Sequence, residues 1–172
     1  GAYCIIFVIV LVNATGFYLP YMHLIPDAID HGARLEEIPS LFFTLGVSSL
    51  ICRLIFCYSS SIVHPLYLLI IALSLQLAAA ISWFYCQTTF SFHGCAFLYG
   101  LSTGGFLVSM RESVQLLVFD PSDDIQYGIA MLHGLAMAPI AFIVGPVFGL
   151  IYHTTGSYLH AKYITTLLAI LS

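Results

Sequence analysis

The charged residues of this sequence leave long apolar gaps between them. Residues 1–26 contain no Asp, Glu, Lys or Arg, residues 38–110 contain only Arg53, and residues 125–161 contain none. A helix needs about 20 apolar residues to cross the hydrocarbon core of a bilayer. The chain has 7% charged residues, whereas about 25% of the residues of a soluble domain are charged. We therefore expect an all-α integral membrane protein whose surface is covered largely by lipid.

Turn-forming residues divide these gaps into six expected helices. The long gap is interrupted at Ser59-Ser60-Ser61 with His64-Pro65, and again at Gln87-Thr88-Thr89. The last expected helix rises only about 15 Å, half a bilayer. The sequence also begins inside an apolar run, so we expect part of a larger protein with its last helix truncated. The expected spans lie near residues 3–24, 39–58, 65–85, 92–117, 127–152 and 163–172.

The polar residues exclude several classes of function. The four Lys and Arg residues do not cluster, and a nucleic-acid partner would require such a cluster to neutralise its phosphates. The sequence has no phosphate-binding glycine loop, nucleophile elbow or pair of metal ligands, so we expect neither an enzyme nor a bound cofactor or metal. Cys86 and Cys95 flank one short loop and could form a disulfide outside the cell, although the odd total of five cysteines argues against a disulfide framework.

Arg53 is the most informative single residue, because it lies in an apolar stretch between Cys52 and Leu54. Placing an arginine near the centre of a bilayer costs about 2.5–3.5 kcal/mol on insertion scales, and such a residue usually faces a bundle interior or a water-filled cavity. Two interpretations stay open. The guanidinium binds an anionic substrate group, with which it can form two parallel hydrogen bonds, or it reaches the membrane surface or pairs with a carboxylate elsewhere in the protein.

Other polar and small residues are candidates for a transport cavity. Glu112 is either an interfacial partner of Arg111 or a cavity residue that carries a proton, and His133 is either a packing residue or part of the cavity. Small residues four positions apart let helix backbones approach closely, which serves either tight packing or a helix that rocks during transport. These small or helix-bending residues are Gly100 and Gly104 in the fourth span and Gly145, Pro146 and Gly149 in the fifth.

Taken in order, several stretches resemble the C-terminal half of a monocarboxylate transporter, a family of the major facilitator superfamily. The resemblance covers nearly the whole chain, and the order and spacing of the stretches make it more specific than any one of them. The stretches are Gly16–Tyr21, Leu41–Gly46 followed by Cys52-Arg53, Tyr99–Gly104, Asp120, and Gly145-Pro146 with Gly149 and Thr155–Tyr158.

The resemblance implies that Arg53 is the arginine that binds the substrate carboxylate, and that the loop over residues 27–37 lies outside the cell. One departure concerns the mechanism. Proton-coupled members of the family have an aspartate one helical turn before the arginine, where this chain has Ser49, which cannot titrate near neutral pH. Coupling to protons through Glu112 or through the N-terminal half, and transport without protons, stay open. A second departure is Val147, which replaces a proline of the family pattern.

We therefore expect the six-helix C-terminal half of a twelve-helix major facilitator fold in a multi-pass protein of the plasma membrane. The expected function is alternating-access transport of small organic anions, above all monocarboxylates. The expected partners are this anion, protons if coupling exists, lipid, the N-terminal half and, as the family implies, a single-span accessory subunit. The alternatives are a carrier of another solute, such as an aromatic amino acid or a thyroid-hormone-like compound, and a membrane receptor or interaction protein without a transport cycle.

Overall fold

The computed structural model describes residue 16, residues 18–117 and residues 142–171. Every regular element in these ranges is a helix, and none of the described residues forms a strand. The prediction of an all-α protein is therefore confirmed. In chain order the elements are a helix over residues 18–30, the short 3-10 helix η1 (Leu35–Glu37), α2 (Ile38–Ser59), α3 (Pro65–Phe84), α4 (Thr89–Leu117), a helix over Phe142–Thr155, and α6 (Leu159–Leu171).

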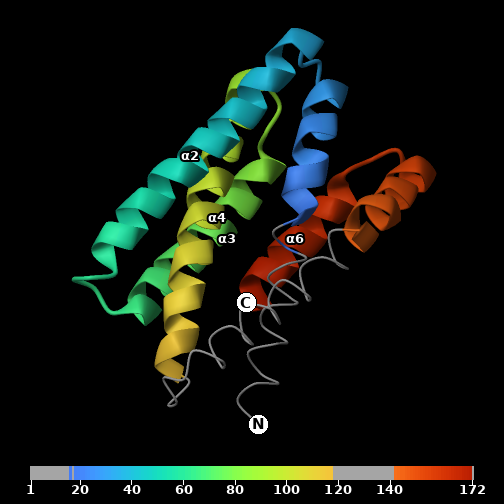
Figure 1. Ribbon diagram of the computed structural model, residues 1–172. Coiled ribbons are helices and arrows are strands. Elements are labelled where there is room, and N and C mark those ends of the chain that lie inside the picture. The colour runs from blue at the N-terminus through green and yellow to red at the C-terminus, as the bar shows by residue number, and fades with distance from the viewer. Residues whose placement is uncertain (1–15, 17, 118–141, 172) are drawn as a thin grey trace.

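Neighbouring helices in the sequence run in opposite directions, so the connections alternate between the two ends of the bundle (Figure 1). α4 packs against both α2 and α3, and α3 also packs against α6. The helix over residues 18–30 joins these two sides, because Asp27 contacts Trp83 of α3 and Lys162 of α6. We call the end that carries residues 31–37, 85–88 and 156–158 the upper end, as it appears in Figure 1.

Two of the described helical segments are long and apolar enough to cross a membrane. They are Leu35–Ser59, with a mean hydropathy of 1.9, and Pro65–Phe84, with a mean hydropathy of 2.0. Both leave large apolar side chains exposed, such as Phe43 on α2 and Ile70 on α3. A continuous apolar surface of this kind suits contact with lipid rather than with water, which supports association of the chain with a membrane.

The contact between α2 and α4 depends on glycine. A Cβ atom placed on Gly104 would lie 2.2 Å from the main-chain oxygen of Ser49, and one placed on Gly100 would lie 1.7 Å from the Ser48 hydroxyl oxygen. No side chain fits at either distance, so the two helices can approach this closely only because Gly100 and Gly104 have no Cβ.

The first described helix ends later than the sequence predicts. The prediction that it ends near Leu24 is wrong, because the helix continues to residue 30. A charged residue is typical of a loop at the end of a membrane span, but the Asp27 carboxylate is buried and paired inside the bundle. The helix ends at Gly32 instead, whose φ of 87° requires glycine and whose amide donates a hydrogen bond to the carbonyl of Ile29.

The last described helix also begins earlier than predicted. α6 starts at Leu159 rather than near Tyr163, because Lys162, which is typical of a loop, is only 7% exposed and lies within the first turn of the helix. α4 begins at Thr89, three residues before the predicted start at residue 92. The bounds of α2 and α3 lie within one residue of the predicted spans. Residues 127–141 of the predicted fifth span lie outside the described residues.

Candidate functional site

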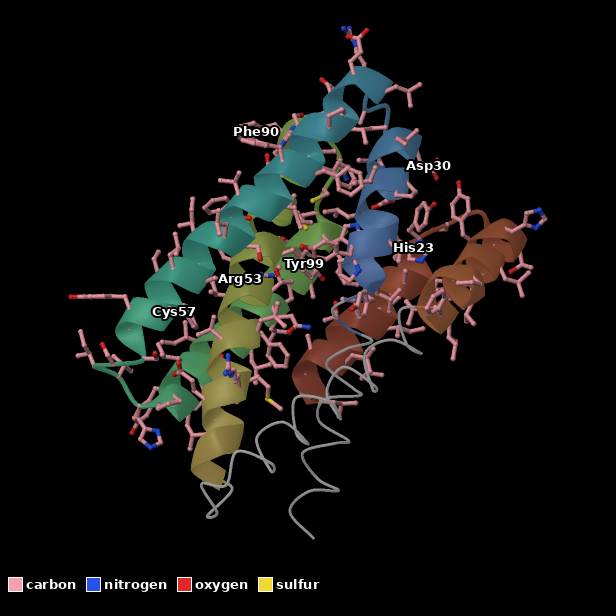
Figure 2. All side chains as sticks on the ribbon, viewed as in Figure 1. His23, Asp30, Arg53, Cys57, Phe90 and Tyr99 are labelled. Atoms are coloured by element: carbon pink, nitrogen blue, oxygen red, sulfur yellow. The ribbon has the colours of Figure 1, made fainter. Side chains whose placement is uncertain are left out.

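Arg53 lies in the second half of α2, well away from the upper end of the bundle that Asp30 and Phe90 mark in Figure 2. Its side chain is exposed, and the neighbouring side chains of Leu50 and Leu54 are exposed and apolar. Among the described residues no carboxylate forms an ion pair with Arg53. The guanidinium therefore places a positive charge on an apolar helix surface without a compensating charge in the described part of the chain.

Arg53 is linked to two neighbouring helices through Tyr21. Tyr21, on the helix over residues 18–30, is hydrogen-bonded to Thr103 of α4 and interacts electrostatically with Arg53. The Thr103 hydroxyl also donates a hydrogen bond of 2.9 Å to the carbonyl of Gly100, which fixes its orientation. We call these three residues the Arg53 group. Because its members come from three helices, their arrangement depends on how those helices pack.

Ser49 lies one turn before Arg53 but is buried between helices. It is 4% exposed, and its main-chain oxygen forms the close contact with Gly104. Its hydroxyl has no hydrogen-bond partner among the described residues. A carboxylate at this position would therefore lie in the interface of α2 with α4, next to the Arg53 group.

The other predicted site residues are not part of the Arg53 group. Glu112 is half-buried near the end of α4, and no hydrogen bond or ion pair in the described ranges joins it to Arg53. His133 lies outside the described residues. A Cβ atom placed on Gly145 or Gly149 would meet nothing within 4 Å, and Pro146 is exposed. Unlike Gly100 and Gly104, these residues make no close helix contact within the described part of the chain.

A buried charge cluster, which the sequence analysis did not predict, lies under the upper end of the bundle. The Lys162 ammonium lies 2.8 Å from Asp27 Oδ2, and the side chains of both residues are less than a tenth exposed. The indole nitrogen of Trp83 donates a buried hydrogen bond of 2.8 Å to the same carboxylate oxygen. Lys162 also lies 5.7 Å from the centre of the Trp83 ring, as in a cation–π contact. Three helices are thus joined through one carboxylate.

Two histidines flank this cluster, His23 on the helix over residues 18–30 and His31 directly after its last residue. His31 Nδ1 lies 2.8 Å from the carbonyl oxygen of Asp27 and 3.5 Å from Asp27 Oδ1. One turn before Asp27, His23 is buried beside the rings of Phe148 and Tyr158. Its Nε2 atom has no hydrogen-bond partner among the described residues. Three polar side chains therefore follow one another at intervals of four residues along this helix and its end.

The cluster could have been found in part from the sequence. His31-Gly32 is typical of a helix end, since glycine readily adopts the left-handed conformation there, and a helix ending at this point would contain Asp27. Lys162 lies in a stretch whose buried residues, Ala161, Lys162, Thr165 and Ala169, recur at helical spacing. No feature of the sequence indicates that Trp83 contacts either of them.

Comparison with known proteins gives no assignment, because no protein-family model and no curated protein matches this chain. In the described ranges, no three His, Cys, Asp or Glu side chains gather as a group that could hold a metal ion. The arrangement of the side chains is therefore the basis for a functional proposal. It provides one cation, Arg53, on an apolar helix without an ion-pair partner among the described residues, and a second cation, Lys162, that is neutralised by Asp27.

Proposed function

We propose that this chain is the C-terminal half of a twelve-helix transporter of the major facilitator type in the plasma membrane. In this proposal the protein moves small organic anions, above all monocarboxylates, by alternating access. Arg53 binds the carboxylate of the solute, and the N-terminal half supplies the rest of the binding site. The order of the motifs in the sequence, from Gly16–Tyr21 to Thr155–Tyr158, supports the family, and the described helices are compatible with it.

The observation that carries the proposal is the contrast between two cations in apolar helices. Lys162 is buried and has its counter-charge, Asp27, at 2.8 Å. Arg53 is exposed and has no ion-pair partner among the described residues. An unpaired charge in a membrane span is costly and usually faces a polar interior or a binding site. An anion from solution would provide the negative charge beside Arg53, as the Asp27 carboxylate does beside Lys162.

The Arg53 group provides suitable chemistry for a carboxylate. A guanidinium offers parallel donors that match the two oxygens of a carboxylate, and the Tyr21 side chain, on a neighbouring helix, interacts electrostatically with Arg53. Once the anion is bound, the pair has no net charge. Neutralisation lowers the cost of moving the site through a low-dielectric environment while one half of the transporter rocks against the other.

The test is uptake of labelled lactate and pyruvate by the full-length protein in proteoliposomes. We expect the unmodified protein to take up these acids and Arg53→Ala to abolish this uptake. The control variant Arg34→Ala, which removes an exposed arginine near η1, should retain it. Uptake of neither acid by a folded preparation would overturn the proposal for monocarboxylates. Equal uptake by Arg53→Ala and the unmodified protein would give Arg53 a structural role.

A second arm of the same experiment addresses proton coupling. Ser49 cannot exchange a proton near neutral pH. If no other residue carries a proton, an inward proton gradient should leave uptake unchanged. The candidates in this chain are Glu112 and His133. A gradient that stimulates uptake, together with loss of this stimulation in Glu112→Gln, would assign the proton to Glu112.

A further inference from the structure

Two cysteines from different elements meet at the upper end of the bundle, next to the buried charge cluster. Cys86 follows α3 in the loop over residues 85–88, and Cys95 lies in the second turn of α4. They are 3% and 1% exposed. Both are free thiols in the structure, and their side chains are close enough to interact with each other.

Independent contacts of the two sulfur atoms place them on the same part of α3. Cys86 Sγ lies 3.4 Å from the carbonyl oxygen of Ser82, and Cys95 Sγ lies 3.6 Å from that of Ala79. Ala79 and Ser82 are three residues apart and therefore lie on one face of α3. Cys86 Sγ also lies 3.3 Å from the carbonyl oxygen of Ser91, one helical turn before Cys95. The two thiols therefore lie side by side between α3 and α4.

The loop that carries Cys86 is held in this position by hydrogen bonds. The amides of Gln87 and Thr88 each donate a hydrogen bond of 3.1 Å to the Ser91 hydroxyl, and the Ser91 amide donates one of 3.3 Å to the Thr88 hydroxyl. These bonds cap the start of α4. The cap fixes the position of Cys86 relative to Cys95 before any covalent bond forms.

We propose that Cys86 and Cys95 are a redox pair that forms an intramolecular disulfide when the upper end of the bundle meets a disulfide oxidant. The bond would link the end of α3 to the second turn of α4. In the orientation proposed for the transporter, this end faces the outside of the cell, where disulfides persist. The inference does not depend on which solute the protein carries.

The chemistry assigns different roles to the two thiols. The hydrogen bond from Cys95 lowers the pKa of the Cys86 thiol, and the Lys162 ammonium acts in the same direction. The Cys86 thiolate attacks one sulfur of the oxidant, for example oxidised glutathione, and releases one glutathione thiolate. The Cys95 sulfur, on losing its proton, then attacks Cys86 in the mixed disulfide and releases the second glutathione. Two electrons pass from the cysteines to the oxidant, and their two protons leave with the two glutathione thiols.

The experiment measures the linkage in the unmodified chain. The detergent-solubilised chain is incubated with oxidised glutathione, quenched with acid, unfolded, alkylated and digested for mass spectrometry. Unfolding before alkylation is essential, because a buried thiol would otherwise escape alkylation without being oxidised. We expect a peptide pair joined through Cys86 and Cys95, lighter by two hydrogen atoms than the reduced pair. Cys57, which is exposed on α2, serves as the internal control and should be alkylated or carry glutathione.

Two single variants test the order of attack. Cys95→Ser should accumulate a glutathione adduct at Cys86, because the second step cannot occur, and Cys86→Ser should leave Cys95 as an unreacted thiol. Complete alkylation of both cysteines in the unmodified chain after oxidation would overturn the proposal. A disulfide that joins either cysteine to Cys57, to Cys52 or to a second chain would also overturn it.

Discussion

Lys162 Nζ and Asp27 Oδ2 lie 2.8 Å apart in the interior of the bundle. This contact joins the first described helix to the last, although the two residues are far apart in the sequence. The indole nitrogen of Trp83 donates a hydrogen bond to the same oxygen, so the carboxylate has both a counter-charge and a neutral donor. A buried ion pair of this kind is costly to break, because removing one partner leaves the other as an uncompensated buried charge.

The first prediction concerns this pair. Lys162→Met should destabilise the folded chain by about 3–5 kcal/mol, the usual cost of leaving one member of a buried pair unpaired. The double variant Asp27→Leu with Lys162→Met should recover much of that loss, because it removes both charges. The measurement is denaturant unfolding in detergent, followed by circular dichroism. If the double variant loses as much stability as the single variants Asp27→Leu and Lys162→Met lose together, the pair is not energetically coupled.

The second prediction contrasts the two cations. Arg53→Leu should stabilise the chain in a membrane by about 2.5–3.5 kcal/mol, because it removes a charge from an apolar span and breaks no ion pair with any described residue. Lys162→Leu, the matched substitution, should destabilise it. A membrane-insertion assay for α2 and unfolding of the whole chain measure the two effects. Destabilisation by Arg53→Leu would mean that Arg53 is a structural residue with a partner outside the described ranges.

The third prediction tests the contact of α2 with α4. Gly104→Ala should destabilise the chain by about 1–3 kcal/mol, the usual cost of overpacking, because its Cβ would lie 2.2 Å from the Ser49 carbonyl oxygen. Gly94→Ala, in the same helix, is the matched control, since a Cβ there meets nothing within 4 Å. This substitution should stabilise α4 by about 0.5–1 kcal/mol, the difference in helix propensity. Equal stability of the two variants would be inconsistent with the close contact.

The fourth prediction concerns alkaline pH. Burial, helped by the nearby Asp30 carboxylate, raises the pKa of Tyr158 from 10.0 to about 12. Above pH 10 the unfolded chain loses this proton while the folded chain retains it. The free energy of unfolding should therefore fall progressively as the pH rises from about 10 to about 12, and below pH 10 this residue should have no effect.

The control for this prediction is Tyr158→Phe, which removes the ionisable group. The difference between the unmodified chain and this variant isolates the contribution of Tyr158 from that of the other tyrosines. Asp30→Asn should reduce the difference, because it removes the negative charge that disfavours the phenolate. Phenolate absorbance gives the pKa directly, and a Tyr158 that titrates near pH 10 in the folded chain would contradict the structure.

The sequence determined the class of the fold and the positions of most helices. Long apolar gaps predict helices because a chain in lipid must satisfy its backbone hydrogen bonds within each segment. Serine, proline and polar residues at 59–65 and 87–89 mark the turns, so α2 and α3 agree with their predicted bounds within one residue. Arg53 stands out in the sequence for the same reason, since it is the one charge within residues 38–110.

The tertiary structure decided which charged residues lie inside the bundle. From the sequence, Asp27 and Lys162 are typical loop residues. This is why two predicted boundaries are wrong, the end of the first helix near Leu24 and the start of the last near Tyr163. A charge can be buried when a partner lies within hydrogen-bonding distance, and that partner comes from another helix. The same holds for the contact of Cys86 with Cys95 and of Gly104 with Ser49. Local sequence patterns specify each helix, but only the packing of the helices determines which of their side chains meet.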